Sequence, residues 1–300
     1  MAVRSLGLHI VSRNRWLVFF GVFGLCGAMA VFWEGTIEQE ARWVGPTTLE
    51  DWPAEIFYLD GRDIVRRGSP TVFAIRLPHG SLLSPHHFEA EKFEEPLSIE
   101  EWGNHVSAPL LINAGQYDEQ FRHLGRLLAS GKKIPSLARN FWFGWLASGP
   151  LEPSTRSRIV DLEKEAKEVL DGYGNLVQSM MLFDEQGRVR VRPSKKVASR
   201  LVVAEDSGGR LVVIHVQGAV TLTDLARWLM VSKLNLRRGM NLDGGAEAQL
   251  LLKTRSMELR LQGKYGTRTP LIASTPTIVA PSLPAIISVS GGGPVTMEAQ

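Results

Sequence analysis

The sequence predicts an α+β domain with a mixed, largely antiparallel sheet core and helices packed on it, preceded by an N-terminal transmembrane helix. Three observations predict this class. Short runs rich in β-branched residues recur along the chain, mostly bounded by Gly, Pro, Asn or Asp. Few segments carry helix start signals, and runs of adjacent strands separate them, which favours α+β over a doubly wound parallel sheet. One apolar run near the amino terminus is long enough to cross a bilayer.

Length and composition fit a globular protein. The chain has 300 residues, of which 44% are hydrophobic and 22% charged, enough to bury a core in one large domain or two small ones. Thirty-four basic residues against 31 acidic ones leave a formal charge of +3. This balance, with no basic stripe interleaved with aromatic residues, argues against a nucleic-acid partner. Cys26 is the only cysteine, so neither a disulfide within the chain nor a cysteine zinc site is possible.

The amino terminus predicts export. Residues 1–15 carry a basic flank, and the uninterrupted apolar run Trp16–Trp33 follows. We expect 1–15 to be cytoplasmic and 16–33 to be a signal anchor, which makes the chain a single-pass protein of the bacterial inner membrane with its main domain in the periplasm or outside the cell. A cleaved signal peptide is the alternative, because Ala28-Met29-Ala30 is an A-x-A site. Both interpretations export the domain.

The exported part divides into a polar linker at 34–54, a domain at 55–290 and a disordered tail at 291–300. Asp206–Gly209, between two apolar runs, is typical of a hairpin turn. The predicted strands are Ile56–Leu59, Thr71–Leu77, Pro109–Asn113, Phe141–Ala147, Ser179–Phe183, Arg188–Val191, Arg200–Ala204, Arg210–Val216, Gln249–Leu252, Met257–Leu261 and Ala285–Val289.

Helices are predicted from their start signals. Ser98–Glu101 is a capping-box pattern. Ser154–Leu170 carries apolar residues at helical spacing, and Thr221–Asp224 opens a further amphipathic helix. Ser84-Pro85 is a further expected helix start.

The segment Asn241-Leu242-Asp243-Gly244-Gly245 is the strongest candidate site. Two adjacent glycines beside a carboxylate let the backbone approach a ligand and expose N–H groups to an anion. Asn241 and Asp243 add a donor and an acid at the same point. The alternative is a plain Asx-Gly turn that joins a helix to a strand.

Other polar residues lie where strands end. Asn113 closes a very apolar strand, and Gln178 and Arg200 lie at strand edges. The histidines lack metal-ligand spacing, so we expect no metal and no cofactor. The pair Trp142 and Trp145 favours core packing over a sugar-stacking platform. There is no G-x-S-x-G elbow, P-loop or G-x-G-x-x-G.

Taken in order, these landmarks resemble the phosphodiester glycosidase family over roughly residues 55–290. The matching pieces are Asn113–Gly115, Leu124–Gly131, Phe143–Leu146, Leu176–Ser179, Ser199–Asp206, Gly218–Leu222, Leu225-Ala226 and Asn241–Gly245.

The resemblance implies cleavage, or at least binding, of a sugar joined through its anomeric oxygen to phosphate. Such a site needs donors for the phosphate and a carboxylate facing the developing oxocarbenium ion. Asp243 is the expected carboxylate, as nucleophile, base or electrostatic stabiliser, and Glu247 is a possible second acid. The expected substrate-binding residues are Asn113, Gln178, Arg200, Asn241, Gly244 and Gly245.

Three positions depart from the family pattern. Ala246-Glu247 stands where relatives have a small pair, Gln217-Gly218-Ala219 where they often have Asp-Gly-Arg, and Met180-Met181 where they tend to have Pro. Glu247 is either an acid or a source of repulsion toward phosphate. Three functions therefore stay open: an envelope glycosidase, an inactive carbohydrate-binding relative, and a membrane-held scaffold.

Overall fold

The computed structural model describes residues 44–152, 155–266 and 280–291. These residues belong to one unit, 40–300, and that unit is described by itself. The predicted segments 1–15 and 16–33 and nearly all of the predicted tail 291–300 lie outside the described residues. Within the described ranges, no helix is long and apolar enough to span a bilayer.

The larger sheet has eleven strands, and all of its pairings are antiparallel. Its spatial order is β1 (Val44–Thr48), β2 (Glu55–Asp60), β3 (Thr71–Arg76), β14 (Leu211–Val220), β13 (Ala198–Asp206), β15 (Leu236–Gly244), β12 (Tyr173–Phe183), β10 (Gly144–Pro150) and β11 (Arg158–Asp161). Strand β7 (Leu127–Ala129) joins at β12, and β8 (Lys132–Lys133) pairs with β7.

The smaller sheet has five antiparallel strands, in the order β17 (Glu258–Gln262), β16 (Gln249–Lys253), β5 (Leu110–Asn113), β18 (Ala285–Ser290) and β4 (Leu82–His87). A two-stranded parallel piece joins β6 (His123–Leu124) to β9 (Ser136–Leu137). The helices of the described ranges are α1 (Ile99–His105), α2 (Leu222–Met230) and the 3₁₀ turns η1 (Lys167–Gly172) and η2 (Gly245–Glu247). The predicted antiparallel sheet is confirmed, but the domain is more sheet-rich than expected.

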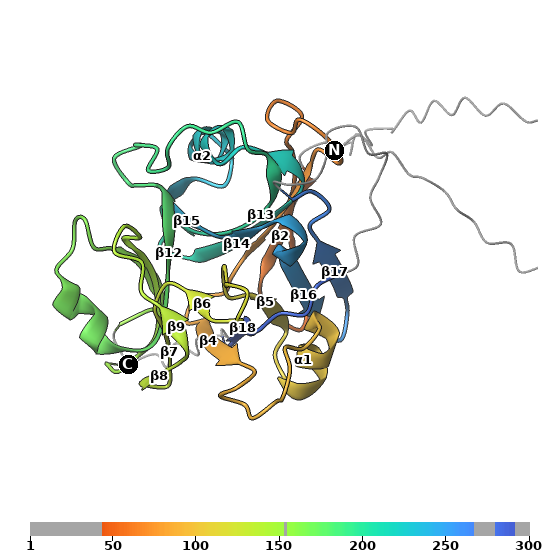
Figure 1. Cartoon of the computed structure of the whole chain (residues 1–300). Helices are drawn as coiled ribbons and strands as arrows, with labels where there is room; N and C mark the ends of the chain where they lie inside the picture. Colours follow the sequence, from red (N-terminus) through yellow and green to blue (C-terminus); the bar gives the residue numbers. More distant parts are fainter. Residues whose placement is uncertain (1–43, 153–154, 267–279, 292–300) are drawn as a thin grey trace, which may run out of the picture. The chain divides into compact units, whose positions relative to one another are not determined.

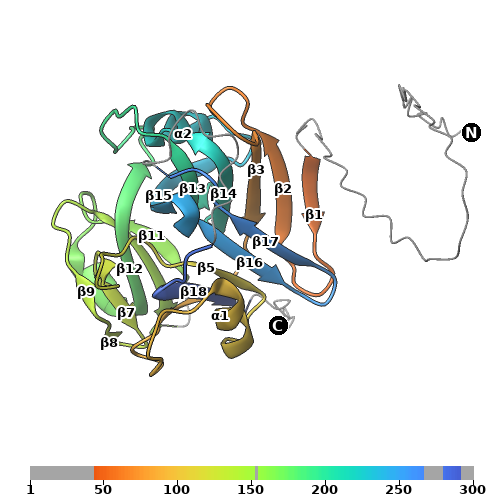
Figure 2. The ribbon, with the colours of Figure 1, turned by 45° about the vertical axis from the view of Figure 1, so that its right-hand side comes forward.

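The two sheets share a core (Figure 2). Because side chains alternate across a strand, the large sheet directs residues such as Leu201 and Val203 toward Ile112 and Leu250 of the small sheet. Its other face buries Val202 and its neighbours under α2. Helix α1 covers the outer face of the small sheet through Ile99 and Trp102. The described unit therefore has four layers in the order α2, large sheet, small sheet, α1 (Figure 1).

Two start signals and the hairpin are confirmed. Ser98 caps α1, and its hydroxyl accepts a hydrogen bond from the Glu101 amide as a capping box requires. Thr221 caps α2 by accepting from the Asp224 amide at 3.0 Å. The hairpin turn joins β13 to β14, where Gly209 adopts a φ of +77°.

The helix predicted at Ser154–Leu170 is wrong. The described part of this stretch contains the edge strand β11 and the start of η1. Ile159 pairs with Leu146 of β10 and faces the shared core, whereas Val160 faces a second apolar cluster on the opposite side. Burying two successive β-branched residues on opposite faces requires an extended chain, so sheet pairing overrides the helical spacing.

Three smaller expectations also differ. Ser84-Pro85 does not begin a helix but lies in β4, an edge strand, where a proline leaves no ladder hydrogen bond missing. Arg188–Val191 forms only an isolated bridge between Val189 and Phe183. Strand β1 lies within the segment expected to be a linker, 34–54.

Strand β15 was not predicted, and it positions the candidate site. Asn241–Gly244 form its carboxyl end rather than a free turn, paired with β13 on one side and β12 on the other. Arg237 and Arg238 conceal the strand in the sequence because they are charged. In the structure, Arg238 is buried against Glu165 and Glu205.

Candidate functional site

An open pocket lies at the edge where strands of both sheets meet. The end of β15, the start of β13 and the loop after β5 surround a volume of about 980 Å³. From the predicted set it is lined by Arg200, Asp243, Gly244, Gly245 and Glu247. Gln116–Phe121, Leu124, Ala198 and Gly266 complete the lining. Five of the eight predicted site residues therefore line one pocket.

Asp243 is the buried carboxylate of this pocket. Its Oδ2 accepts a hydrogen bond from Asn113 Nδ2 at 3.0 Å, and its Oδ1 accepts from the amide of Gly244 at 2.7 Å. Asn113 also donates to the carbonyl of Glu247 at 2.7 Å, while its own Oδ1 accepts from the Gly115 amide at 2.8 Å. Asn113 thus joins the small sheet to the large one and holds the carboxylate in place without lining the pocket.

Burial raises the pKa of Asp243 to about 7. The hydrogen bond from the Gly244 amide and the amide of Asn113 lower it, as does the charge of Arg200, whereas the carboxylate of Glu247 raises it further. A carboxylic acid with a pKa near neutrality exchanges its proton readily at physiological pH. That property suits general acid–base catalysis.

Arg200 carries the positive charge of the pocket. It is only 6% exposed, and its Nε has no hydrogen-bond partner among the described residues. Burial lowers its pKa to about 10, an effect that Asp243 partly offsets, so the guanidinium stays charged at neutral pH. A buried, charged donor without a partner is costly unless a ligand completes it. An anion such as phosphate supplies the acceptors that a guanidinium fork matches.

The double glycine is required by its surroundings. A Cβ on Gly244 would lie 2.6 Å from Nη1 of Arg200 and 2.8 Å from the carbonyl of Ser199, closer than real contacts allow. Gly245 has a φ of +84°, which side-chain-bearing residues rarely adopt. The two glycines let Arg200 lie against the end of β15 and let η2 turn Glu247 toward the pocket.

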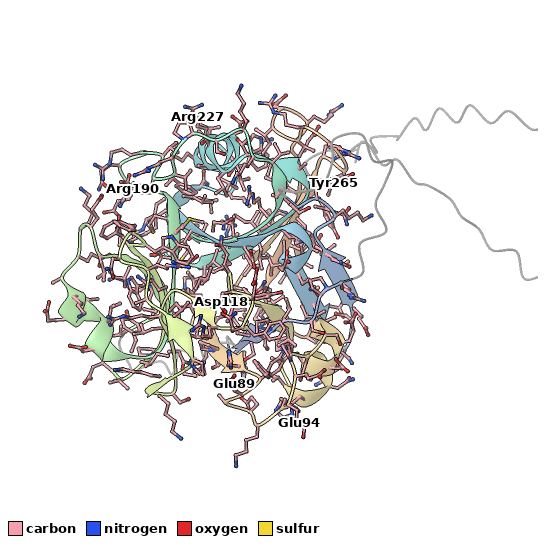
Figure 3. All side chains as sticks on the ribbon, in the orientation of Figure 1. Glu89, Glu94, Asp118, Arg190, Arg227 and Tyr265 are labelled. Carbon is pink, nitrogen blue, oxygen red and sulfur yellow. The ribbon has the colours of Figure 1, made fainter. Side chains whose placement is uncertain are left out.

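The loop after β5 supplies residues that the sequence analysis missed. Burial raises the pKa of Tyr117, and the nearby carboxylates of Glu247 and Asp243 raise it further. Asp118, labelled in Figure 3, holds the loop by accepting from the amides of Gln120 and Arg122 at 3.0 and 2.9 Å. Phe121 is 40% exposed, has a φ of +60° and packs near the Tyr117 ring, with centroids 6.2 Å apart. In the sequence, Asp118 before a short polar segment was the feature that could have indicated this ordered loop.

Besides Asn113, two predicted residues do not line the pocket, Gln178 and Asn241. The Gln178 side chain forms its hydrogen bonds with backbone groups. Its Oε1 accepts from the Arg126 amide at 2.8 Å, and its Nε2 donates to the carbonyls of Arg139 and Trp142 at 2.9 and 2.8 Å. Asn241 is fully buried, and neither side-chain polar atom has a partner among the described residues. Trp145 is buried in a core cluster, as the packing interpretation expected, whereas Trp142 is half-buried and belongs to no core cluster of the described residues.

Most departures from the family pattern lie away from the pocket. Gln217 accepts at its carbonyl from the Ser199 hydroxyl, and Ala219 bonds to the backbone of Arg67. Met181 belongs to the shared core. None of these is part of the pocket lining, whereas Glu247 is. Glu247 is therefore the departure that bears directly on ligand binding.

The sequence model of a family described as phosphodiester glycosidase matches residues 107–276, more than half of the chain. The chain belongs to the phosphodiester glycosidase family. Every residue of the pocket lies inside the matched range. No protein of curated function matches the chain at a significant level.

Two solved structures resemble this phosphodiester glycosidase domain. The catalytic domain of zebrafish N-acetylglucosamine-1-phosphodiester alpha-N-acetylglucosaminidase, auto-inhibited by its pro-peptide, has a TM-score of 0.53 and 14% identity, with 83% of this chain and 87% of that chain covered. A hypothetical protein from Synechocystis has the same TM-score and identity, with 79% of this chain and 62% of that chain covered. This chain thus spans less than two thirds of the Synechocystis protein. At 14% identity, these likenesses show the fold alone.

Proposed function

We propose that the chain is an exported, membrane-anchored hydrolase that cleaves a sugar 1-phosphodiester in an envelope or exported glycan. One observation carries the proposal: the buried guanidinium of Arg200, whose Nε has no hydrogen-bond partner among the described residues, lines the same pocket as Asp243, a carboxylic acid with a near-neutral pKa. The pocket thereby combines an anion receptor with a group able to transfer a proton. Family membership supports the reaction class.

The residues suggest a division of roles. Arg200 binds the phosphate, and phosphate is a leaving group that departs with little protonation. Because both oxygens of Asp243 accept hydrogen bonds, its ionised form is held as a proton acceptor, and it takes a proton from the attacking water. Water then adds to the anomeric carbon as the bond to the phosphate oxygen breaks. Glu247 stabilises the positive charge on the sugar, and Phe121 and Tyr117 offer rings for stacking.

The test is release of reducing sugar from a panel of sugar 1-methylphosphodiesters. Arg200→Gln removes the charge, and we expect kcat/KM to fall about 100-fold or more, since the phosphate loses its charged donor. Arg200→Lys keeps the charge but lacks the forked guanidinium, and its kcat/KM should lie between those of the wild type and Arg200→Gln. Exposed Arg192, changed to Gln, is the control. Wild-type turnover in Arg200→Gln would refute the assignment.

A catalytically inactive carbohydrate-binding protein, or an envelope scaffold, is the second candidate, and Glu247 favours it. A carboxylate that raises the pKa of Asp243 also repels a phosphate in the same pocket. Glu247→Gln separates the two. If Glu247 supports catalysis, turnover falls and the binding of an uncleaved analogue changes little. If Glu247 blocks phosphate, no turnover occurs in the wild type and the variant binds a phosphodiester more tightly.

Export and anchoring rest on the basic flank at 1–15 and the apolar run Trp16–Trp33. The same features support a location in the bacterial inner membrane with the domain in the periplasm or outside the cell. Alkaline phosphatase fused to the carboxyl terminus of the full chain should be active in cells. An inactive, stably expressed fusion would contradict export.

A further inference from the structure

A second open pocket, of about 930 Å³, lies beside the start of α2. Its lining carries four cationic side chains: Arg66, Lys195, Lys196 and Arg227. Asp224 is the one acidic residue of the lining, and it already pairs with Arg66 at 2.9 Å. Among the described residues neither lysine makes an ion pair, and Arg227 lies near enough to Asp224 for its charge to lower the pKa of that carboxyl. We name these four cations with Thr223 the basic pocket.

The basic pocket continues the candidate site. Gly266 lines both pockets, and Val197 of the basic pocket is followed by Ala198 of the candidate site. Two residues further along the same strand, Arg200 projects into the candidate site. The segment from Lys195 to Arg200 therefore runs from one pocket into the other, and a ligand longer than one sugar phosphate would meet both.

The start of α2 adds donors of its own. The first N–H groups of a helix have no partner within the helix and attract anions. Here Thr221 caps only the Asp224 amide. Thr223 lines the pocket, is 7% exposed, and its hydroxyl has no hydrogen-bond partner among the described residues. A buried hydroxyl left unpaired in a cationic pocket points to a ligand that supplies its partner.

The candidate site and the basic pocket differ in the charge of the side chains that line them. At one end lie Asp118, Glu119 and Glu247 with the aromatic rings. At the other end lie the basic pocket and Arg227, labelled on α2 in Figure 3. A neutral sugar fits the first end, and negative charge fits the second. This polarity sets a direction for a bound chain.

We propose that the basic pocket binds further anionic groups of the substrate, so that the ligand is a polyanionic chain in which the scissile sugar phosphate is followed by more phosphate groups. This inference rests on the proposed function for its orientation, because the sugar end must occupy the pocket of Asp243. The anion-binding capacity of the basic pocket itself stands on Thr223, the two lysines and Arg227, since Arg66 is paired with Asp224.

Isothermal titration calorimetry of the full-length chain with sodium tripolyphosphate tests the inference. In Lys195→Glu/Lys196→Glu, we expect the affinity to fall about tenfold or more, because two attractive charges become repulsive. Lys132→Glu/Lys133→Glu makes the same change of charge on the exposed strand β8, and we expect less than a twofold effect. Thr223→Val should weaken binding by a smaller factor through the lost hydroxyl alone. Inorganic phosphate, run in parallel, should bind at least tenfold more weakly than tripolyphosphate.

Three outcomes would overturn the inference: no tripolyphosphate binding by the wild type, equal losses in both double variants, or equal affinities for phosphate and tripolyphosphate. Turnover of a sugar 1-methylphosphodiester by the unaltered chain reports the proposed function separately, since that substrate carries one phosphate. Turnover without tripolyphosphate binding would reject only the extended polyanion. Tripolyphosphate binding lost in Lys195→Glu/Lys196→Glu, without turnover, would support the anion site and reject the hydrolase.

Discussion

Asp243 shows how burial converts an ordinary carboxylate into a proton-exchanging group. Two hydrogen bonds and Arg200 favour its charged form, yet removal from water outweighs them and raises the pKa to about 7. The buried carboxylate that the expected chemistry requires therefore destabilises the folded state when it is ionised. In the folded protein Asp243 keeps its proton to a higher pH than it does in the unfolded protein. The free energy of unfolding therefore falls as the pH rises from about 4 to about 7.

Asp243→Asn removes that dependence. Above pH 7 the variant avoids a buried charge, but it mismatches the two donors that face the carboxylate, so we expect a net gain of about 1–3 kcal/mol at pH 8. Below pH 4 the gain disappears, because the carboxyl is then protonated in both states. Urea unfolding at several pH values measures this, with exposed Asp63→Asn as control. A variant less stable than the wild type at pH 8 would contradict the cost assigned to the buried charge.

At the scale of elements, strands β12 and β15 have different roles. β15 carries Asp243 to the pocket, whereas β12 uses Gln178 to hold the loop between Arg126 and Trp142. The sequence placed Gln178 at a strand edge and assigned it to substrate. The observed amide makes three hydrogen bonds to backbone groups and lies outside the pocket lining. A polar residue at a strand end looks the same in the sequence whether it faces a ligand or a neighbouring loop.

Gln178→Ala should therefore affect stability rather than substrate binding. Losing its three hydrogen bonds leaves three partly buried backbone groups without their side-chain partner, and we expect a cost of about 2–4 kcal/mol. Chemical denaturation measures the loss, and kcat/KM well below the melting temperature should stay within about threefold of wild type. Exposed Gln186→Ala serves as the control. A large rise in KM without loss of stability would restore the substrate-binding role.

At the scale of the whole domain, the site depends on how the two sheets face each other. Asn113 comes from β5 of the small sheet and Asp243 from β15 of the large one, and their contact bridges 130 positions in the sequence. The shared core between the sheets sets the spacing of this contact. A substitution that disrupts that core should therefore also disturb the Asn113–Asp243 contact in the pocket.

Ile112→Ala tests whether the two sheets form one cooperative core. Ile112 is fully buried beside Asn113, and truncation removes apolar contacts between the sheets, at an expected cost of about 2–5 kcal/mol. Because the sheets share one core, unfolding should stay a single transition at a lower midpoint. Val231→Ala, at a position 83% exposed, should change stability by less than about 0.5 kcal/mol. Two separate transitions in Ile112→Ala would show that the sheets unfold independently.

The sequence by itself predicted the antiparallel strands, the caps of α1 and α2, and the set of Arg200, Asp243 and the double glycine, which line one pocket. These features are local: strand propensity, capping hydrogen bonds and glycine conformations depend on a few neighbouring residues. Only the tertiary structure decided that 158–161 is an edge strand, that β15 exists, that Gln178 serves a loop, and that Tyr117 and Phe121 join the pocket. Each of these depends on partners distant in the chain, since strand pairing and burial are set by the packed layers and not by the residues alone.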